Sequence, residues 1–158
     1  MATSHCSTPF GTITVVATAR GICRVRFPNE TRPLEDGDSS AAAATLAKGV
    51  SRKLARYFGG KAVEFDEPLD LNGASDFYQR VWRELRKVPR GKTLSYAELA
   101  RRTGKPNAAR AVGAAMATNP VPVLIPCHRV IRSDGSLGGF GGGLDLKRRL
   151  LELERTRG

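Results

Sequence analysis

The pattern of apolar residues changes near Asn72-Gly73, and this change limits the folds open to the chain more than any other feature. Before it, residues 12–18 (TITVVAT) and 22–27 (ICRVRF) are β-branched runs separated by a Gly-containing turn, which predicts antiparallel strands. After it, apolar residues recur at the spacing of amphipathic helices. The sequence therefore predicts an α+β protein, with a sheet-plus-helix domain over 1–72 and a mainly helical domain over 73–158.

Further elements are predicted in the first domain. Residues 41–58 have apolar side chains at every fourth position and predict a helix that ends at Gly59-Gly60. Residues 28–40 are rich in turn formers and predict a loop, and residues 63–71 predict a short strand that leads out of the domain.

The second domain contains a predicted pair of helices joined by a tight turn. After an amphipathic helix over 76–88, Ser95 is the predicted N-cap of a helix over 96–103, and Glu98 completes a capping box. Another helix is predicted over 108–118. Helix, short Gly-containing turn and helix form the unit of helix-turn-helix DNA-binding proteins, although many helix pairs in protein cores look alike.

Positive charge is concentrated in the second domain. Residues 73–158 carry 17 of the 26 Lys and Arg but 7 of the 15 Asp and Glu. A basic half joined to a nearly neutral half indicates that the basic half meets a polyanion, most simply nucleic acid, and a merely soluble basic surface is the alternative. The helix pair contains four of these basic residues, Arg101, Arg102, Lys105 and Arg110.

The helix predicted over 108–118 is built almost wholly of small residues. A helix this slim either packs closely against its neighbours or enters a narrow groove of DNA, and the two interpretations are compatible. Arg110 is its one long cationic side chain, and it is a candidate for insertion into the base stack or for a phosphate contact.

Residues 119–130 (NPVPVLIPCHRV) contain the strongest candidate for chemistry. Their prolines make the approach to Cys127 rigid and non-helical. A neighbouring base or cation lowers the pKa of a thiol from its free value of about 8.5, and His128 follows Cys127 directly. A lone Cys is more often a small buried hydrophobe, but that interpretation does not explain the polar His128 and Arg129.

In order along the chain, the helix pair, residues 119–130 and the Gly-rich residues 138–143 resemble motifs of the O6-alkylguanine-DNA alkyltransferases, the methylated-DNA–protein-cysteine methyltransferases. The likeness runs from about Phe77 to Glu154, which is half of the chain. Residues 1–72 are similar to this family in layout only. The resemblance implies a ribonuclease-H-like sheet domain followed by a domain with a winged-helix-like helix-turn-helix unit.

The resemblance also implies DNA repair by direct reversal, in which the alkyl group of O6-alkylguanine, and of O4-alkylthymine, is removed from double-stranded DNA. Cys127 would accept the alkyl group once, without turnover. His128 would activate the thiol through a bound water, and Glu154, on a helix predicted over 145–155, would orient the imidazole. The damaged nucleotide has to leave the duplex to reach the thiol.

Further residues match family positions around this centre. The resemblance implies that Asn119 ties the recognition helix to the active-site segment, and that Tyr96 hydrogen bonds or protonates guanine N3. Arg110 would fill the gap left by the flipped nucleotide, and Ala97 and Ser133 would contact DNA.

The resemblance assigns a base pocket to Val130, Phe140 and Gly141. Some relatives have Asn at Gly139 and Ser at Gly141, so this chain departs from them at two positions. We expect activity because the backbone N–H of Gly141 is retained. From composition alone, the Gly-rich run would instead be a flexible link before the last helix.

No cofactor is implied. Some relatives bind structural zinc in the first domain, but His5, Cys6 and Cys23 include no C-x-x-C pair and no clear fourth ligand, so we expect no metal. The odd number of cysteines, with no signal peptide and no membrane-length apolar run, predicts free thiols in a cytoplasmic protein that binds no membrane. We expect a monomer.

Other classes of function explain fewer of these features. Alkyltransferase-like proteins bind the same lesions but lack the acceptor cysteine. A helix-turn-helix transcription regulator explains the charge and the helix pair but leaves Cys127, His128 and Glu154 unused. A cysteine hydrolase requires an exposed nucleophile and an oxyanion hole, and it turns over.

Overall fold

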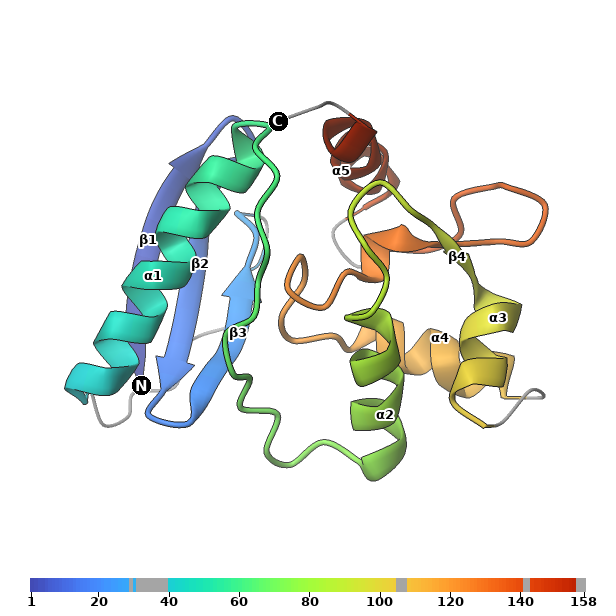
Figure 1. Ribbon diagram of the computed structural model, residues 1–158, viewed down its shortest axis with the longest axis horizontal. Coiled ribbons are helices and arrows are strands. Elements are labelled where there is room, and N and C mark those ends of the chain that lie inside the picture. Colours follow the sequence, from blue (N-terminus) through green and yellow to red (C-terminus); the bar gives the residue numbers. More distant parts are fainter. Residues whose placement is uncertain (29, 31–39, 105–107, 141–142, 156–158) are drawn as a thin grey trace. The chain divides into compact units, whose positions relative to one another are not determined.

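The computed structural model describes the chain except residues 29, 31–39, 105–107, 141–142 and 156–158 (Figure 1). The chain divides into two compact units, one formed by Met1–Asn72 and the other starting at Gly73. None of the described helices is long and apolar enough to cross a membrane.

The first unit is an antiparallel sheet with a helix packed on it (Figure 1). Its elements are, in chain order, β1 (Ala2–Thr8), β2 (Gly11–Thr18), β3 (Gly21–Arg26) and α1 (Ala41–Phe58). The strands pair in the order β1-β2-β3. Ile13, Val15 and Ala17 alternate along β2 and are fully buried, because this face of the strand forms the core.

Helix α1 forms where the apolar spacing predicts it. Ser40 begins the helix, since its Oγ accepts a hydrogen bond from the Ala43 N–H at 3.1 Å. Val50, Leu54 and Phe58, spaced four residues apart, are buried.

The strand predicted over 63–71 is wrong. Leu69 forms only an isolated bridge with Ile22, in which the Ile22 N–H donates to the Pro68 carbonyl at 2.9 Å and the Asp70 N–H donates to the Ile22 carbonyl at 2.8 Å. Proline has no N–H to extend the ladder, so the pairing stops there.

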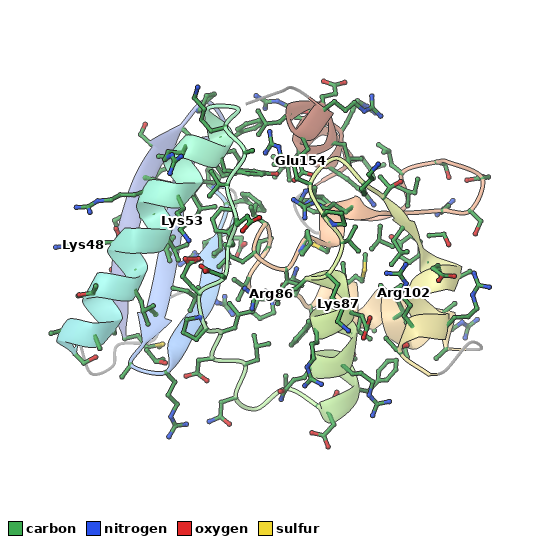
Figure 2. The ribbon with its side chains drawn as sticks, in the orientation of Figure 1. Lys48, Lys53, Arg86, Lys87, Arg102 and Glu154 are labelled. Atoms are coloured by element: carbon green, nitrogen blue, oxygen red, sulfur yellow. The ribbon has the colours of Figure 1, made fainter. Side chains whose placement is uncertain are left out.

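Charged side chains hold the preceding residues to α1 instead. Lys53 Nζ lies 2.7 Å from Glu67 Oε2 and 3.2 Å from Asp66 Oδ1. Figure 2 shows Lys53 beside carboxylate oxygens, whereas Lys48 extends away from the same helix. This segment therefore reaches Asn72 as an irregular chain anchored by ion pairs.

The sequence did not reveal strand β1. Its residues ATSHCST are mostly small or polar, so the alternation of burial is weak, yet Ala2 and Cys6 are buried against the core. The loop predicted over 28–40 lies largely outside the described residues.

The second unit is mainly helical. Its elements are α2 (Asp76–Leu85), β4 (Leu94–Ser95), α3 (Tyr96–Arg102), α4 (Ala109–Ala117), β5 (Val130–Ile131) and α5 (Leu144–Arg155). The short strands β4 and β5 pair in parallel through Leu94 with Val130 and Ser95 with Ile131. Because β4 leads directly into α3, this pairing brings the start of α3 close to the segment that precedes β5.

The slim helix α4 has one buried face and one exposed face. Val112, Ala115 and Met116 are buried, and the Trp82 indole N–H of α2 donates to the Ala115 carbonyl at 2.8 Å. Arg110 is exposed. Close packing therefore explains the small residues of one face, and the other face remains open to a partner.

The start of α3 follows only half of the predicted capping box. Ser95 Oγ accepts a hydrogen bond from the Glu98 N–H at 3.1 Å, as an N-cap does. The Glu98 carboxylate, however, pairs with Arg101 and Arg102 one turn later rather than reaching back to Ser95. Two arginines compete for it, and a charged partner is stronger than a neutral N–H.

The predicted fold class is confirmed. The protein is α+β, with a sheet-plus-helix unit followed by a mainly helical unit that contains the helix pair α3 and α4.

Candidate active site

The segment between α4 and Cys127 is clamped by a single side chain. Asn119 Nδ2 donates to the Ile125 carbonyl at 2.9 Å, and Asn119 Oδ1 accepts from the Val121 N–H at 2.9 Å. The two bonds tie both ends of the Pro-rich loop to the end of α4, so the loop has a fixed course toward Cys127.

Val123, inside this loop, has a left-handed backbone with φ of 74°. A β-branched residue is rarely found in this region, and the conformation costs on the order of 1–3 kcal/mol. The side chain is nevertheless buried, together with those of Val121 and Ile125. Burial of these three side chains stabilises the strained loop.

Cys127 begins a 3₁₀ turn, Cys127–Arg129, and is only 6% exposed. Burial raises the pKa of its thiol above the ordinary value, while the Asn119 side chain and the Lys147 ammonium act in the opposite direction. The sequence predicts that neighbouring groups lower this pKa. They do act in that direction, but the net shift is upward because desolvation of the thiolate outweighs them.

His128, Arg129 and Glu154 form a largely buried cluster that joins the 3₁₀ turn to α5, on which Figure 2 labels Glu154. Glu154 Oε2 accepts from His128 Nε2 at 2.7 Å and from Arg129 Nη2 at 2.8 Å, and Glu154 Oε1 accepts from Arg129 Nε at 2.9 Å. Arg129 Nη1 also donates to the Val88 carbonyl at 2.7 Å. Arg129 thus holds both oxygens of the Glu154 carboxylate, and the carboxylate holds the His128 ring through one hydrogen bond.

The charges within this cluster follow from its contacts. Burial alone would raise the pKa of Glu154, but the hydrogen bonds from His128 and Arg129 outweigh burial and hold that pKa far below its usual range. Burial lowers the pKa of His128, and the bond to Glu154 opposes this only in part. A neutral imidazole that donates from Nε2 to a carboxylate carries its lone pair on Nδ1. In this arrangement Glu154 fixes the orientation of the His128 ring, and a neutral His128 can accept a proton at Nδ1.

Cys127 lies in the wall of a pocket of about 390 Å³. The pocket is lined by Tyr96 from α3, by Gly113, Met116 and Ala117 from α4, and by Cys127, Gly139 and Phe140. Small residues of α4 leave this space open. The pocket brings together three of the predicted site residues, Tyr96 from α3, Cys127 from the 3₁₀ turn and Phe140 from the Gly-rich run.

Tyr96 packs tightly against the Gly-rich run. Its hydroxyl donates to the Gly139 carbonyl at 3.4 Å. A Cβ on Gly138, whose φ is +70°, would lie 2.9 Å from the Tyr96 ring and hydroxyl, so only glycine fits there. Burial raises the pKa of Tyr96, and the phenol keeps its proton at neutral pH.

Other predicted site residues lie outside the pocket lining. Val130 is fully buried in β5, where it pairs with Leu94. Ala97, Arg110 and Ser133 are exposed, so their predicted contacts with DNA stay predictions. Gly141 lies outside the described residues.

Two basic residues of the site were missed by sequence reasoning. Arg129 was noted only as a polar neighbour, yet it holds Glu154 with two bonds. Lys147 of α5 is 0% exposed and donates to backbone carbonyls of the segment before α5. A signal was present, because Lys147, Leu150 and Glu154 share one face of α5 at the spacing of a buried stripe.

The cysteines of the first unit are not among the residues that line this pocket. His5 Nδ1 is hydrogen bonded to Thr14 Oγ1 at 2.9 Å, Cys6 is buried, and Cys23 Sγ contacts the Val16 carbonyl at 3.4 Å. Among the described residues, no group of three or more His, Cys, Asp or Glu is placed to hold a metal ion.

Family models match both units of the chain. Residues 76–156 match the DNA binding domain of 6-O-methylguanine DNA methyltransferase, and residues 1–71 match the ribonuclease-like domain of the same family. The predicted ribonuclease-like layout of the first unit is thereby confirmed.

Individual relatives that the chain resembles carry the name of the same family. The methylated-DNA–protein-cysteine methyltransferase of Mycolicibacterium paratuberculosis is 44% identical over 93% of this chain and 88% of its own length. The protein of the same name from Mycobacterium tuberculosis is 52% identical over 69% of this chain and 66% of its own length, just under two thirds. A crystal structure of Mycobacterium tuberculosis OGT in complex with DNA superposes with a TM-score of 0.84 at 40% identity, and covers 97% of this chain and 92% of that one.

Proposed function

Because the chain belongs to the 6-O-methylguanine DNA methyltransferase family, we propose that it repairs DNA by transferring the alkyl group of O6-alkylguanine to Cys127. The observation that carries the proposal is the pocket of about 390 Å³ that Cys127 shares with Tyr96 and Phe140. A pocket of this size and mostly apolar lining suits a planar base. A regulator of transcription would have no use for it, nor for the buried cluster behind it.

The chemistry needs a thiolate, although the resting thiol is protonated. The proton of Cys127 Sγ passes through a bound water to His128 Nδ1, and Glu154 stabilises the imidazolium that forms. Sulfur then attacks the alkyl carbon in line, so that the S–C bond forms while the C–O6 bond breaks. The electron pair leaves with guanine, which takes a proton at N3 from the Tyr96 hydroxyl.

The product is a thioether, and the described site contains no group placed to hydrolyse one. Each molecule therefore acts once. O4-alkylthymine offers the same alkyl–oxygen bond and is the second expected substrate.

The substrate has to reach Cys127 from within a duplex. We propose that the damaged nucleotide is flipped into the pocket, at a cost of a few kcal/mol in lost stacking. Exposed Arg110, at the start of α4, fills the gap in the base stack, and exposed Ala97 and Ser133 contact the strand. The related structure in complex with DNA supports DNA as the partner, and so does the basic second unit; we propose that the DNA is double-stranded.

We further propose that the protein is a cytoplasmic monomer. The free cysteines Cys6, Cys23 and Cys127 suit a reducing compartment. A single species of monomer mass in sedimentation, with and without reductant, is the expected result.

The deciding experiment combines the protein with a duplex that contains one O6-methylguanine and measures the intact mass. The wild-type protein should gain one methyl group. Cys127→Ala should gain none, and Cys23→Ala, which removes a half-buried thiol of the first unit, should gain one as the wild type does. A wild-type protein that folds and remains unmodified would overturn the proposal.

A further inference from the structure

Helix α5 carries a lysine that no part of the proposed reaction uses. Lys147 is 0% exposed, and its Nζ donates to the Val130 carbonyl at 2.6 Å, to the Gly139 carbonyl at 3.2 Å and to the Leu137 carbonyl. Lysine is almost never fully buried without a paired charge. Within the described residues, the hydrogen-bond partners of Lys147 are carbonyls rather than a carboxylate.

The contacts define the charge of this group. An ammonium has three N–H donors and no acceptor, and three carbonyl oxygens use all three donors. Burial lowers the pKa of Lys147 to about 8, which still leaves it protonated at neutral pH. Lys147 is therefore a cation that has no lone pair to act as a base.

The carbonyls come from parts of the unit that form the site. Val130 ends the turn that begins with Cys127, and Gly139 lies in the pocket wall against Tyr96. Lys147 Nζ also lies 5.9 Å from the centre of the Tyr96 ring. One ammonium thus connects α5, β5 and the Gly-rich run around a single pocket.

The ammonium also acts on the nucleophile. Its charge favours the thiolate of Cys127 against the desolvation that opposes it. Other titratable or charged groups face this pair: Tyr96 from α3, His128 from the 3₁₀ turn, and Arg132 after β5. Of these, only Arg132 is permanently charged, and it is exposed to solvent, which screens it.

We propose that Lys147 is a positioning residue for alkyl transfer, whose ammonium holds the pocket wall at Gly139 and stabilises the thiolate of Cys127. The part of this inference that concerns alkyl transfer rests on the proposed function. The effect on the thiol itself is independent of the substrate.

Two variants separate the charge from the hydrogen bonds. Lys147→Met keeps an unbranched side chain without charge or donors, and Lys147→Gln keeps two N–H donors without charge. Lys147→Arg retains the charge. Arg148→Met, an exposed position on the same helix, is the matched control.

The first measurement is the rate at which iodoacetamide modifies Cys127 across the neutral and alkaline pH range, resolved by peptide mass mapping. In Lys147→Gln and Lys147→Met, the midpoint of this profile should rise by about one pH unit, which lowers the rate at neutral pH about tenfold. Lys147→Arg and Arg148→Met should keep the wild-type midpoint. If Lys147→Met does not fold, Lys147→Gln decides the point.

The second measurement is the rate of methyl transfer from a duplex that contains O6-methylguanine. It should fall about tenfold at neutral pH in Lys147→Gln and recover as the pH rises. An unchanged thiol midpoint in folded Lys147→Gln would overturn the inference. A wild-type protein that transfers no methyl group, but whose thiol midpoint depends on Lys147, would overturn the proposed function and leave this inference standing.

Discussion

Replacing Glu154 with glutamine removes one negative charge from the buried cluster without changing the shape of the side chain. The Glu154 side chain is 1% exposed, and its two oxygens accept one bond from His128 and two from Arg129. A glutamine amide has one oxygen and one NH₂ group, so one position that now accepts would face an N–H donor. Either His128 or Arg129 loses its partner, and Arg129 loses its counter-charge in both cases.

The cost can be worked from these contacts. Hydrogen bonds to charged groups contribute about 1.5–3 kcal/mol each, and removal of one partner from a buried ion pair costs about 3–5 kcal/mol. Because the glutamine oxygen still accepts some of these hydrogen bonds, we expect a loss of about 3 kcal/mol in the free energy of unfolding. The total free energy of unfolding of a folded protein is about 5–15 kcal/mol, so this loss would be a large fraction of it.

Urea unfolding followed by tryptophan fluorescence measures this effect. Trp82 is the sole tryptophan of the chain and lies in the same unit as Glu154, so the signal reports that unit. Glu152→Gln, the same substitution at an exposed position of α5, is the control and should change stability by less than about 0.5 kcal/mol. Equal losses in the two variants would refute the reasoning, because the cluster would then contribute no more than a solvated carboxylate.

Three more outcomes are expected. The free energy of unfolding should fall as the pH drops below about 6.5, by up to about 1.4 kcal/mol per pH unit. The reason is that the folded state lowers the pKa of His128, so the unfolded chain takes up the proton first. A free energy of unfolding that stays constant with pH in urea titrations would contradict this. Gly138→Ala should slow methyl transfer because its Cβ would push Tyr96 aside. Gly135→Ala, which also has a positive φ but no neighbour within 4 Å, should not; equal rates of transfer would contradict the close fit. Arg110→Ala should slow transfer from duplex DNA more than transfer from an O6-alkylguanine free base, and equal losses would show that this side chain does not assist flipping.

The elements that the sequence predicted well are those whose pattern repeats. Helix α2 has Val81, Trp82 and Leu85 on one face, and these are the residues it buries. Strand β1 was missed because its polar residues hide the alternation, and the strand over 63–71 was wrong because Pro68 ends its pairing. The local composition of a segment does not determine which of its backbone N–H and C=O groups pair with another strand.

The candidate site also has features that the sequence predicted and features that it did not. The resemblance to a family predicted that His128 and Glu154, which are 26 residues apart in sequence, lie close together. In the structure they form a hydrogen bond of 2.7 Å. The raised pKa of Cys127 could not be read from neighbours in sequence, since it depends on how deeply the thiol is buried. Lys147 was missed because lysine is normally a surface residue, although its spacing to Leu150 and Glu154 is that of a buried stripe on α5.

Helix α5 brings both Lys147 and Glu154 to a turn that precedes it in the chain. During synthesis on the ribosome, Cys127 is therefore made before the cation and the carboxylate that we propose act on it. Glu154 follows His128 by 26 residues, and a chain grows at about 5–20 residues per second, so the interval is on the order of seconds. Under the proposed single-use reaction, this order means that a nascent chain has Cys127 without its reaction partners until the second unit is almost complete.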